Sequence, residues 1–202
     1  MVIDTELNRG NRILGDLQKL LHPLSRPVTD YKIYDGNRKD GFCCDSSDWE
    51  DLRTGGSWDG QDRHRWFRAT VTLPPEFDRR FVEFSILTGR EGQEDAINPQ
   101  MLFYVNGKIA QGIDVNHRQV VLSENAAGET FEIAFLVYGG SKPGSIQITT
   151  ELRVRDLAVE RLYYDLSVPL QAARVLRGRD EASCRRILAV TSSCLLYTSD
   201  AA

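Results

Sequence analysis

The feature that most constrains the fold is a long stretch, from Val28 to about Glu160, in which apolar and polar residues alternate with a period of two. Such alternation is typical of strands that bury one face only. The clearest run, residues 66–73, divides its side chains between two faces: Trp66, Arg68, Thr70 and Thr72 on one, and Phe67, Ala69, Val71 and Leu73 on the other. Segments rich in Gly, Pro, Asn and Asp separate the runs. The chain is therefore predicted to be mainly β, with an antiparallel β-sandwich or jelly roll.

One turn in this stretch is strongly specified. Asn106-Gly107 stands between the apolar run 101–105 and a second run that begins at 108. A two-residue type I′ turn requires positive φ at both central positions, and Asn-Gly meets this requirement best. We therefore predict a tight hairpin here. Residues 146–154 ("IQITTELRV") are expected to form one strand later in the same domain.

Both ends of the chain change to a helical period. Residues 3–21 carry apolar side chains three and four positions apart, and His22-Pro23 is expected to end this amphipathic helix. Residues 166–176 and 181–190 repeat the pattern, with Gly178 as a break between them. The expected organisation is an N-terminal helical segment over 1–27, a β-sandwich over 28–162 and a helical linker over 163–193.

Composition excludes several classes of protein. The formal net charge of -4 gives no electrostatic case for nucleic-acid binding. No run approaches the roughly 18 apolar residues that span a bilayer, and the N-terminus has no signal-peptide core, so we expect a cytoplasmic protein without membrane contact. The four cysteines include no CxxC pair, which argues against a cysteine zinc site and a disulfide scaffold.

The last nine residues, 194–202 ("CLLYTSDAA"), fit neither a closing helix nor a polar tail. Back-translated in one frame, they resemble the transposon-end adaptor of sequencing libraries. We therefore expect these residues to be an artefact and the natural chain to continue beyond Ser193 into further sequence.

Two clusters are candidate sites for substrate or interdomain contact. In residues 55–68, Trp58 offers a ring for stacking on a sugar, with Asp59 and His64 as hydrogen-bonding groups. The alternative is that Trp66 lies in the core and Trp58 closes a loop over it. The second cluster lies just after the hairpin and consists of Gln111, Asp114, Asn116, His117 and Arg118. It is interpreted as a structured, interfacial connection between strands, which would dock a further domain or an oligomer partner. We predict no catalytic residue and no metal ligand in this chain.

Three runs of sequence carry a family resemblance: "GGSWDGQDRHRWFRATVTLP", "NPQMLFYVNGKIAQGIDVNHRQVVL" and "FEIAFLVYGG". Together they resemble the N-terminal domain of family-38 α-mannosidases, of the cytosolic and vacuolar type in fungi and bacteria. The first run is shared by many galactose-binding-like sandwiches, whereas the second is much more specific. The following "YYDLSVPLQAARVL" is similar to the linker toward that family's catalytic domain.

The resemblance implies a fragment of a retaining enzyme that hydrolyses α-mannosidic bonds in oligosaccharides. It implies zinc for the whole enzyme, with all catalytic residues and metal ligands in a missing C-terminal domain, and no cofactor in this fragment. The expected partners are that catalytic domain, mannose-containing oligosaccharide and further copies of the chain. Two other functions remain open: a stand-alone carbohydrate-binding module or lectin, and the sandwich of another multidomain glycosidase.

Overall fold

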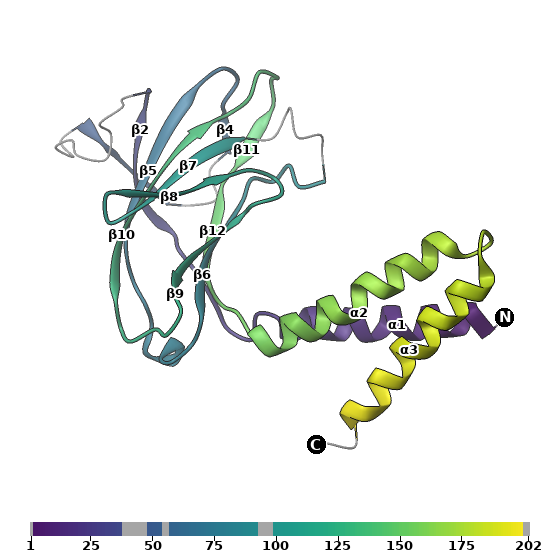
Figure 1. Cartoon of the computed structure of the whole chain (residues 1–202). Coiled ribbons are helices and arrows are strands. Elements are labelled where there is room, and N and C mark those ends of the chain that lie inside the picture. Colours follow the sequence, from purple (N-terminus) through teal and green to yellow (C-terminus); the bar gives the residue numbers. More distant parts are fainter. Residues whose placement is uncertain (1, 38–47, 54–56, 93–98, 200–202) are drawn as a thin grey trace. The chain divides into compact units, whose positions relative to one another are not determined.

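The computed structural model describes residues 2–37, 48–53, 57–92 and 99–199 (Figure 1). The chain forms two compact units. A β unit comprises residues 24–154, and a helical unit combines residues 1–23 with 155–202. The strand-rich unit therefore ends eight residues before the boundary expected at 162.

The described residues of the β unit form three antiparallel sheets. The six-stranded sheet has the order β3 (Glu50–Arg53), β2 (Asp30–Asp35), β5 (His64–Thr72), β10 (Thr130–Tyr138), β7 (Gln100–Val105), β8 (Lys108–Ile113). The four-stranded sheet has the order β1 (Ser25–Pro27), β12 (Thr149–Val154), β6 (Val82–Leu87), β9 (Gln119–Ser123). A short third sheet pairs β11 (Ser145–Gln147) with β4 (Ser57–Asp59), and a 3-10 turn, η2, covers Pro75–Phe77.

The two larger sheets pack face to face and enclose one apolar core, which confirms the predicted β-sandwich. Phe135 of β10 is fully buried at its centre. Its ring stacks on Phe67 at 4.9 Å and on Phe103 at 5.9 Å between centroids. Phe67, Ala69 and Val71 all face this core, as the alternation in residues 66–73 predicts.

The Asn106-Gly107 hairpin is confirmed. Asn106 has φ 47° and Gly107 has φ 81°, so both central residues adopt the positive φ that a type I′ turn needs. Val105 of β7 pairs with Lys108 of β8 directly across this turn.

The prediction of one strand over residues 146–154 is wrong. The run is divided between β11, which pairs with β4, and β12, which pairs with β1 and β6. Ile146, Ile148 and Leu152 are all buried. The apolar alternation continues through the break because both short strands bury their inner face in the same core, and alternation alone does not show a change of sheet.

The helical unit consists of α1 (Val2–Leu20), α2 (Leu157–Leu176) and α3 (Glu181–Ser199). Each helix contacts the other two. Their common core is small and contains Leu7, Leu170, Ala173, Cys184 and Leu188. None of the described helices is both long enough and apolar enough to cross a membrane.

The bounds of α2 and α3 differ from those expected. α2 begins at Leu157, inside the range assigned to the sandwich, because Asp156 caps it by accepting hydrogen bonds from the N–H groups of Ala158 and Val159, both at 3.0 Å. Gly178, with φ 76°, lies between α2 and α3 as the sequence predicts. α3 continues through Ser199, so the backbone of 194–199 is helical although the sequence indicated no helix there. Residues 200–202 lie outside the described residues.

Candidate functional site

The face of the six-stranded sheet that points away from the core carries a second apolar cluster. We call it the outer aromatic cluster; its members are Tyr34, Trp49, Trp66, Tyr104, Ala134 and Leu136. Cross-strand register builds it, because Trp66 of β5 lies between Tyr34 of β2 and Leu136 of β10. The outward-facing side of a sandwich sheet is usually polar, so aromatic side chains there mark this face as unusual.

The rings of this cluster contact one another closely. The Trp66 and Tyr104 centroids are 5.4 Å apart, and those of Tyr34 and Trp49 are 5.9 Å apart. Trp66 is 1% exposed, whereas Tyr34 and Tyr104 are half-buried. Burial raises the pKa of the Tyr104 hydroxyl. The cluster therefore has a closed centre and two tyrosines at its margin.

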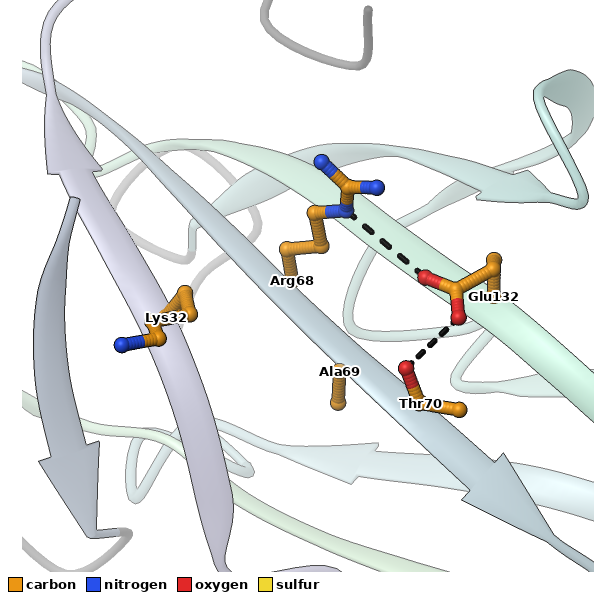
Figure 2. A pocket seen from close by; sticks show the side chains of 5 residues that line it. All are labelled: Lys32, Arg68, Ala69, Thr70 and Glu132. Carbon is orange, nitrogen blue, oxygen red and sulfur yellow. Dashed lines mark hydrogen bonds and ion pairs between the residues drawn. The ribbon is translucent and has the colours of Figure 1, made fainter. Parts of the chain in front are cut away.

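A shallow pocket of about 280 Å³ opens on the outer face. It is lined by Lys32 of β2, Arg68, Ala69 and Thr70 of β5, and Glu132 of β10 (Figure 2). In the sheet register, Lys32 pairs with Arg68, which pairs with Ala134. Ala134 itself is fully buried within the outer aromatic cluster.

Glu132 is the centre of the polar contacts in the pocket. The Thr70 hydroxyl donates a hydrogen bond to Glu132 Oε1 at 2.6 Å, and Arg68 Nε lies 3.7 Å from Glu132 Oε2. Lys32 stands apart from this pair (Figure 2) and forms an ion pair with Asp51 of β3 at 2.5 Å. The pocket thus presents two cations, one carboxylate and one hydroxyl.

The Asn106-Gly107 turn helps to position Glu132. The Asn106 side chain accepts a hydrogen bond from the Glu132 backbone N–H at 2.9 Å, and the Asn106 N–H donates to the Glu132 carbonyl at 2.8 Å. This reciprocal pair anchors the hairpin turn to β10. The turn that the sequence identifies most clearly therefore supports the backbone that carries the pocket carboxylate.

The pocket residues are suited to binding a ligand and not to breaking a bond. Glycoside hydrolysis normally uses two carboxyl groups on opposite sides of the bond that breaks, and among the described residues that line the pocket Glu132 alone carries a carboxyl group. An Arg beside a carboxylate, with a hydroxyl and a Lys nearby, suits hydrogen bonding to several hydroxyl groups of one ligand. Over the described part of the chain, no group of three or more His, Cys, Asp or Glu residues is placed to hold a metal ion.

The first predicted cluster lies where β4 leads into β5. Trp58 is 7% exposed and belongs to the main core. The Arg65 guanidinium lies over the Trp58 ring, 4.9 Å from its centroid. The core and Arg65 together therefore cover the ring, and no face is open for stacking on a sugar. Asp59 is exposed and accepts a long hydrogen bond from the Gln61 N–H at 3.4 Å. His64 is half-buried against Tyr138, with ring centroids 5.0 Å apart.

The second predicted cluster connects β8 of one large sheet to β9 of the other. Asp114 Oδ1 accepts hydrogen bonds from the N–H groups of Asn116 and His117 at 2.8 and 2.7 Å, and lies 3.0 Å from His117 Nδ1. Partial desolvation acts to raise the pKa of Asp114, but these hydrogen bonds outweigh it and lower the pKa. The Gln111 side chain donates to the Gln119 carbonyl at 2.9 Å, and the Arg118 carbonyl accepts from Ile86 N–H at 3.0 Å.

The structure does not bring the two predicted clusters together. β10 and β7 lie between β5 and β8, so His64 and Asp114 are separated by three strand spacings, roughly 14 Å. The pocket residues Lys32 and Glu132 were not singled out from the sequence. The sequence does place Arg68 and Thr70 on the face of residues 66–73 that points away from the core. Polar residues at the outward-facing positions of a neighbouring strand would then have indicated a pocket.

No family model matches the sequence, and no curated protein sequence matches it. Solved structures to which part of this chain is similar include a β-glucuronidase from an uncultured Clostridium species (11% identity, covering 66% of this chain and 29% of that chain, TM-score 0.45). A second is a family 2 glycosyl hydrolase from Bacteroides cellulosilyticus (14% identity, covering 64% of this chain and 20% of that chain, TM-score 0.46). A third is a β-glucuronidase from Bacteroides uniformis (16% identity, covering 65% of this chain and 18% of that chain, TM-score 0.47).

This chain spans less than a third of the length of each of these proteins. All three names describe glycosidases and none describes an α-mannosidase. Likeness at this level carries no inference about the substrate of this chain, and the family-38 resemblance rests on the sequence alone.

Proposed function

We propose that the β unit is a non-catalytic domain that binds carbohydrate through the outer face of its six-stranded sheet. One observation carries this proposal: a polar pocket with Arg68, Thr70 and Glu132 opens on the face that also bears the outer aromatic cluster. Sugars combine hydroxyl groups with apolar C–H faces, and a site that joins fixed polar groups to aromatic rings matches both.

Each pocket group has a defined part in this proposal. Arg68 donates to ring or hydroxyl oxygens, and Glu132, held by Thr70, accepts from sugar hydroxyls. Lys32 lines the pocket from the neighbouring strand β2, and its amine is paired with Asp51. Tyr34 and Tyr104, the half-buried tyrosines of the outer aromatic cluster, lie on the same face of the sheet as the pocket. The bond-breaking step belongs to another domain.

The parent protein is proposed to be a glycoside hydrolase, and more finely an α-mannosidase. Support comes from the runs "NPQMLFYVNGKIAQGIDVNHRQVVL" and "GGSWDGQDRHRWFRATVTLP", which resemble the N-terminal domain of family 38. In that case the missing catalytic domain carries the zinc and the catalytic residues, and the cluster from Gln111 to Arg118 serves as a docking surface. An intact reading frame that continues into Asp- and His-rich zinc motifs would support this parent; one that continues into unrelated sequence would refute it.

The binding proposal is tested by titrating the purified chain with mannose and with α-linked mannobiose in a calorimeter. We expect weak but saturable binding, which Arg68→Ala and Glu132→Gln each reduce by about tenfold or more, because each loses a hydrogen bond to a charged group. Lys142→Ala, at an exposed loop position, is the matched control and leaves binding unchanged.

Circular dichroism establishes that each variant is folded before titration. If saturable binding persists in both pocket variants, the sugar binds outside the pocket. Titrations of the original chain that show no binding heat up to the highest sugar concentration would contradict the carbohydrate-binding proposal. The non-catalytic part is checked with an aryl α-mannoside: release of nitrophenol by the chain, with or without added zinc, would contradict it.

A further inference from the structure

Helix α2 has two apolar faces. One face carries Leu166, Leu170 and Ala173 and is buried in the helical unit. The opposite face carries Leu157, Tyr164, Val168 and Val175, which are 50%, 57%, 62% and 62% exposed. A surface helix normally presents polar residues opposite its buried face, and a helix that is apolar on both sides is typical of one that is covered on both sides. We call the exposed set the α2 stripe.

The spacing of the α2 stripe is that of a coiled-coil seam. Its four members are separated by seven, four and seven positions, which is the a/d pattern of the heptad repeat. Arg161 and Gln171 fill the two remaining seam positions. The seam extends from Leu157 to Val175; it is polar at positions 161 and 171, and Pro169 lies inside the helix next to Val168.

The spacing of the α2 stripe is the same in both directions along the helix, so the stripe can pair with an antiparallel copy of itself. Because the separations read seven, four, seven in either direction, two antiparallel copies of α2 place Leu157 against Val175 and Tyr164 against Val168. Each of these contacts occurs twice, and Arg161 lies against Gln171 between them. In this register every apolar member of the seam meets another apolar member.

Charge favours the same arrangement. Residues 156–166 contain three acids, Asp156, Glu160 and Asp165, and one base, whereas residues 167–177 contain two bases, Arg174 and Arg177, and no acid. Antiparallel pairing lays the acidic half of each helix along the basic half of the other. At the edge of the seam it brings Glu160 of one copy beside Arg174 of the other.

Both side chains also have a partner within their own chain, and the Glu160 side chain is only 21% exposed. Arg155 Nε binds one carboxylate oxygen of Glu160, Oε1, at 2.8 Å. Arg174 donates to the neutral side chain of Asn11. We propose that the α2 stripe is a self-association surface on which a second copy of this chain binds antiparallel through Leu157, Tyr164, Val168 and Val175. This proposal does not depend on the proposed carbohydrate site.

The first test measures association of the full 202-residue chain by sedimentation velocity from about 5 to 200 μM. We expect a concentration-dependent dimer that Val168→Glu weakens by at least about tenfold, since a charge at the centre of an apolar seam is strongly unfavourable. Val190→Glu, on α3 at 64% exposure and outside the stripe, is the matched control and leaves the dimer unchanged. A chain that is monomeric throughout this range, or equal effects of both variants, would overturn the proposal.

The second test establishes the register by charge exchange. In Glu160→Lys dimers, two like-charged Lys–Arg contacts form, and in Arg174→Glu dimers two Glu–Glu contacts form, so each variant should associate about three- to tenfold more weakly alone. A mixture of the two restores both opposite-charge contacts, and the mixed dimer should associate as tightly as the original chain. A mixture that associates no better than either variant would refute the antiparallel register.

Discussion

The β unit and the helical unit differ in how completely each buries its own apolar residues. Among the described residues, the main core of the β unit contains 24 buried side chains, whereas the helical unit has a core of five. The exposed large apolar residues show the opposite distribution. Six lie on helices (Leu20, Leu157, Tyr164, Val168, Val175 and Val190), and two lie on strands (Ile109 and Val121). The sandwich therefore completes its core within residues 24–154. The helices expose apolar surface of the kind that is typical of an interaction site.

The largest loss of stability is expected for a substitution at the centre of the sandwich. Phe135→Ala should lower the free energy of unfolding by about 3–5 kcal/mol, because it removes a fully buried ring that packs between Phe67 and Phe103. Urea denaturation followed by tryptophan fluorescence measures the change. Ile109→Ala, at 63% exposure on β8, is the control and should change stability by less than about 0.5 kcal/mol. Similar effects of the two substitutions would show that Phe135 is not at a tightly packed centre.

A smaller effect is expected in the helical unit, where two glycines of α1 form a matched pair. A Cβ on Gly10 would lie 2.6 Å from the buried Leu170 side chain, whereas a Cβ on Gly15 has no heavy atom within 4 Å. Gly10→Ala should therefore cost about 1–3 kcal/mol through overpacking, and Gly15→Ala should gain up to about 1 kcal/mol in helix propensity. Thermal melting monitored at the helical dichroism band separates them. If Gly10→Ala is stabilising, α1 does not pack closely on α2.

The buried Tyr31 hydroxyl should make the sandwich sensitive to alkaline pH. Burial raises the pKa of Tyr31, and its hydrogen bond with Thr150 Oγ1 at 2.6 Å opposes this only in part. The folded-state pKa lies above the unfolded value, so this contribution to stability is complete below about pH 10 and is lost as pH rises above it. Tyr31→Phe should cost about 1 kcal/mol at pH 7 and should reduce the loss of stability between pH 9 and 11. Parallel pH dependences of the two proteins would contradict this assignment.

The smallest effect is expected at the exposed corner between β8 and β9. Asp114→Ala leaves the N–H groups of Asn116 and His117 without their acceptor and should cost about 0.5–1 kcal/mol. Asp114→Asn keeps an acceptor oxygen and should restore most of the loss. Because the pKa of Asp114 is lowered in the fold, the contribution of its charge is present above pH 4 and is lost as pH falls, and Asp114→Asn should not show that dependence. Equal stabilities of the Ala and Asn variants would indicate that the turn does not need this acceptor.

Local pattern was sufficient to predict most of the sandwich. The two faces of residues 66–73 and the Asn106-Gly107 turn follow from the geometry of a single strand and a single turn, and both are confirmed. The start of α2 at Leu157 was missed because its Asp156 cap directly follows the last strand, where two periods overlap over a few residues. The division of residues 146–154 between sheets depends on pairing partners, which the run itself does not contain.

The candidate site was less accessible to sequence reasoning. Lys32, Arg68 and Glu132 come from three strands that are distant in sequence, and only the register of β2, β5 and β10 places them around one pocket. Trp58 attracted attention as an aromatic residue in a polar loop, but its side chain lies in the main core under Arg65. Exposure of an aromatic ring is a property of the assembled fold and does not follow from the polarity of its neighbours in sequence.

The way in which the β unit closes has a consequence for synthesis of the chain. The Val154 N–H donates a hydrogen bond to the Leu24 carbonyl at 2.9 Å, so the sandwich begins and ends at adjacent points, between α1 and its helical partners in sequence. A ribosome that adds about 5–20 residues per second needs roughly 7–27 s to proceed from Leu20 to Leu157. During that interval the buried face of α1, including Leu7, has no α2 or α3 to pack against. We therefore expect a nascent chain to complete the sandwich first, while the apolar face of α1 stays without its packing partners until α2 and α3 are made.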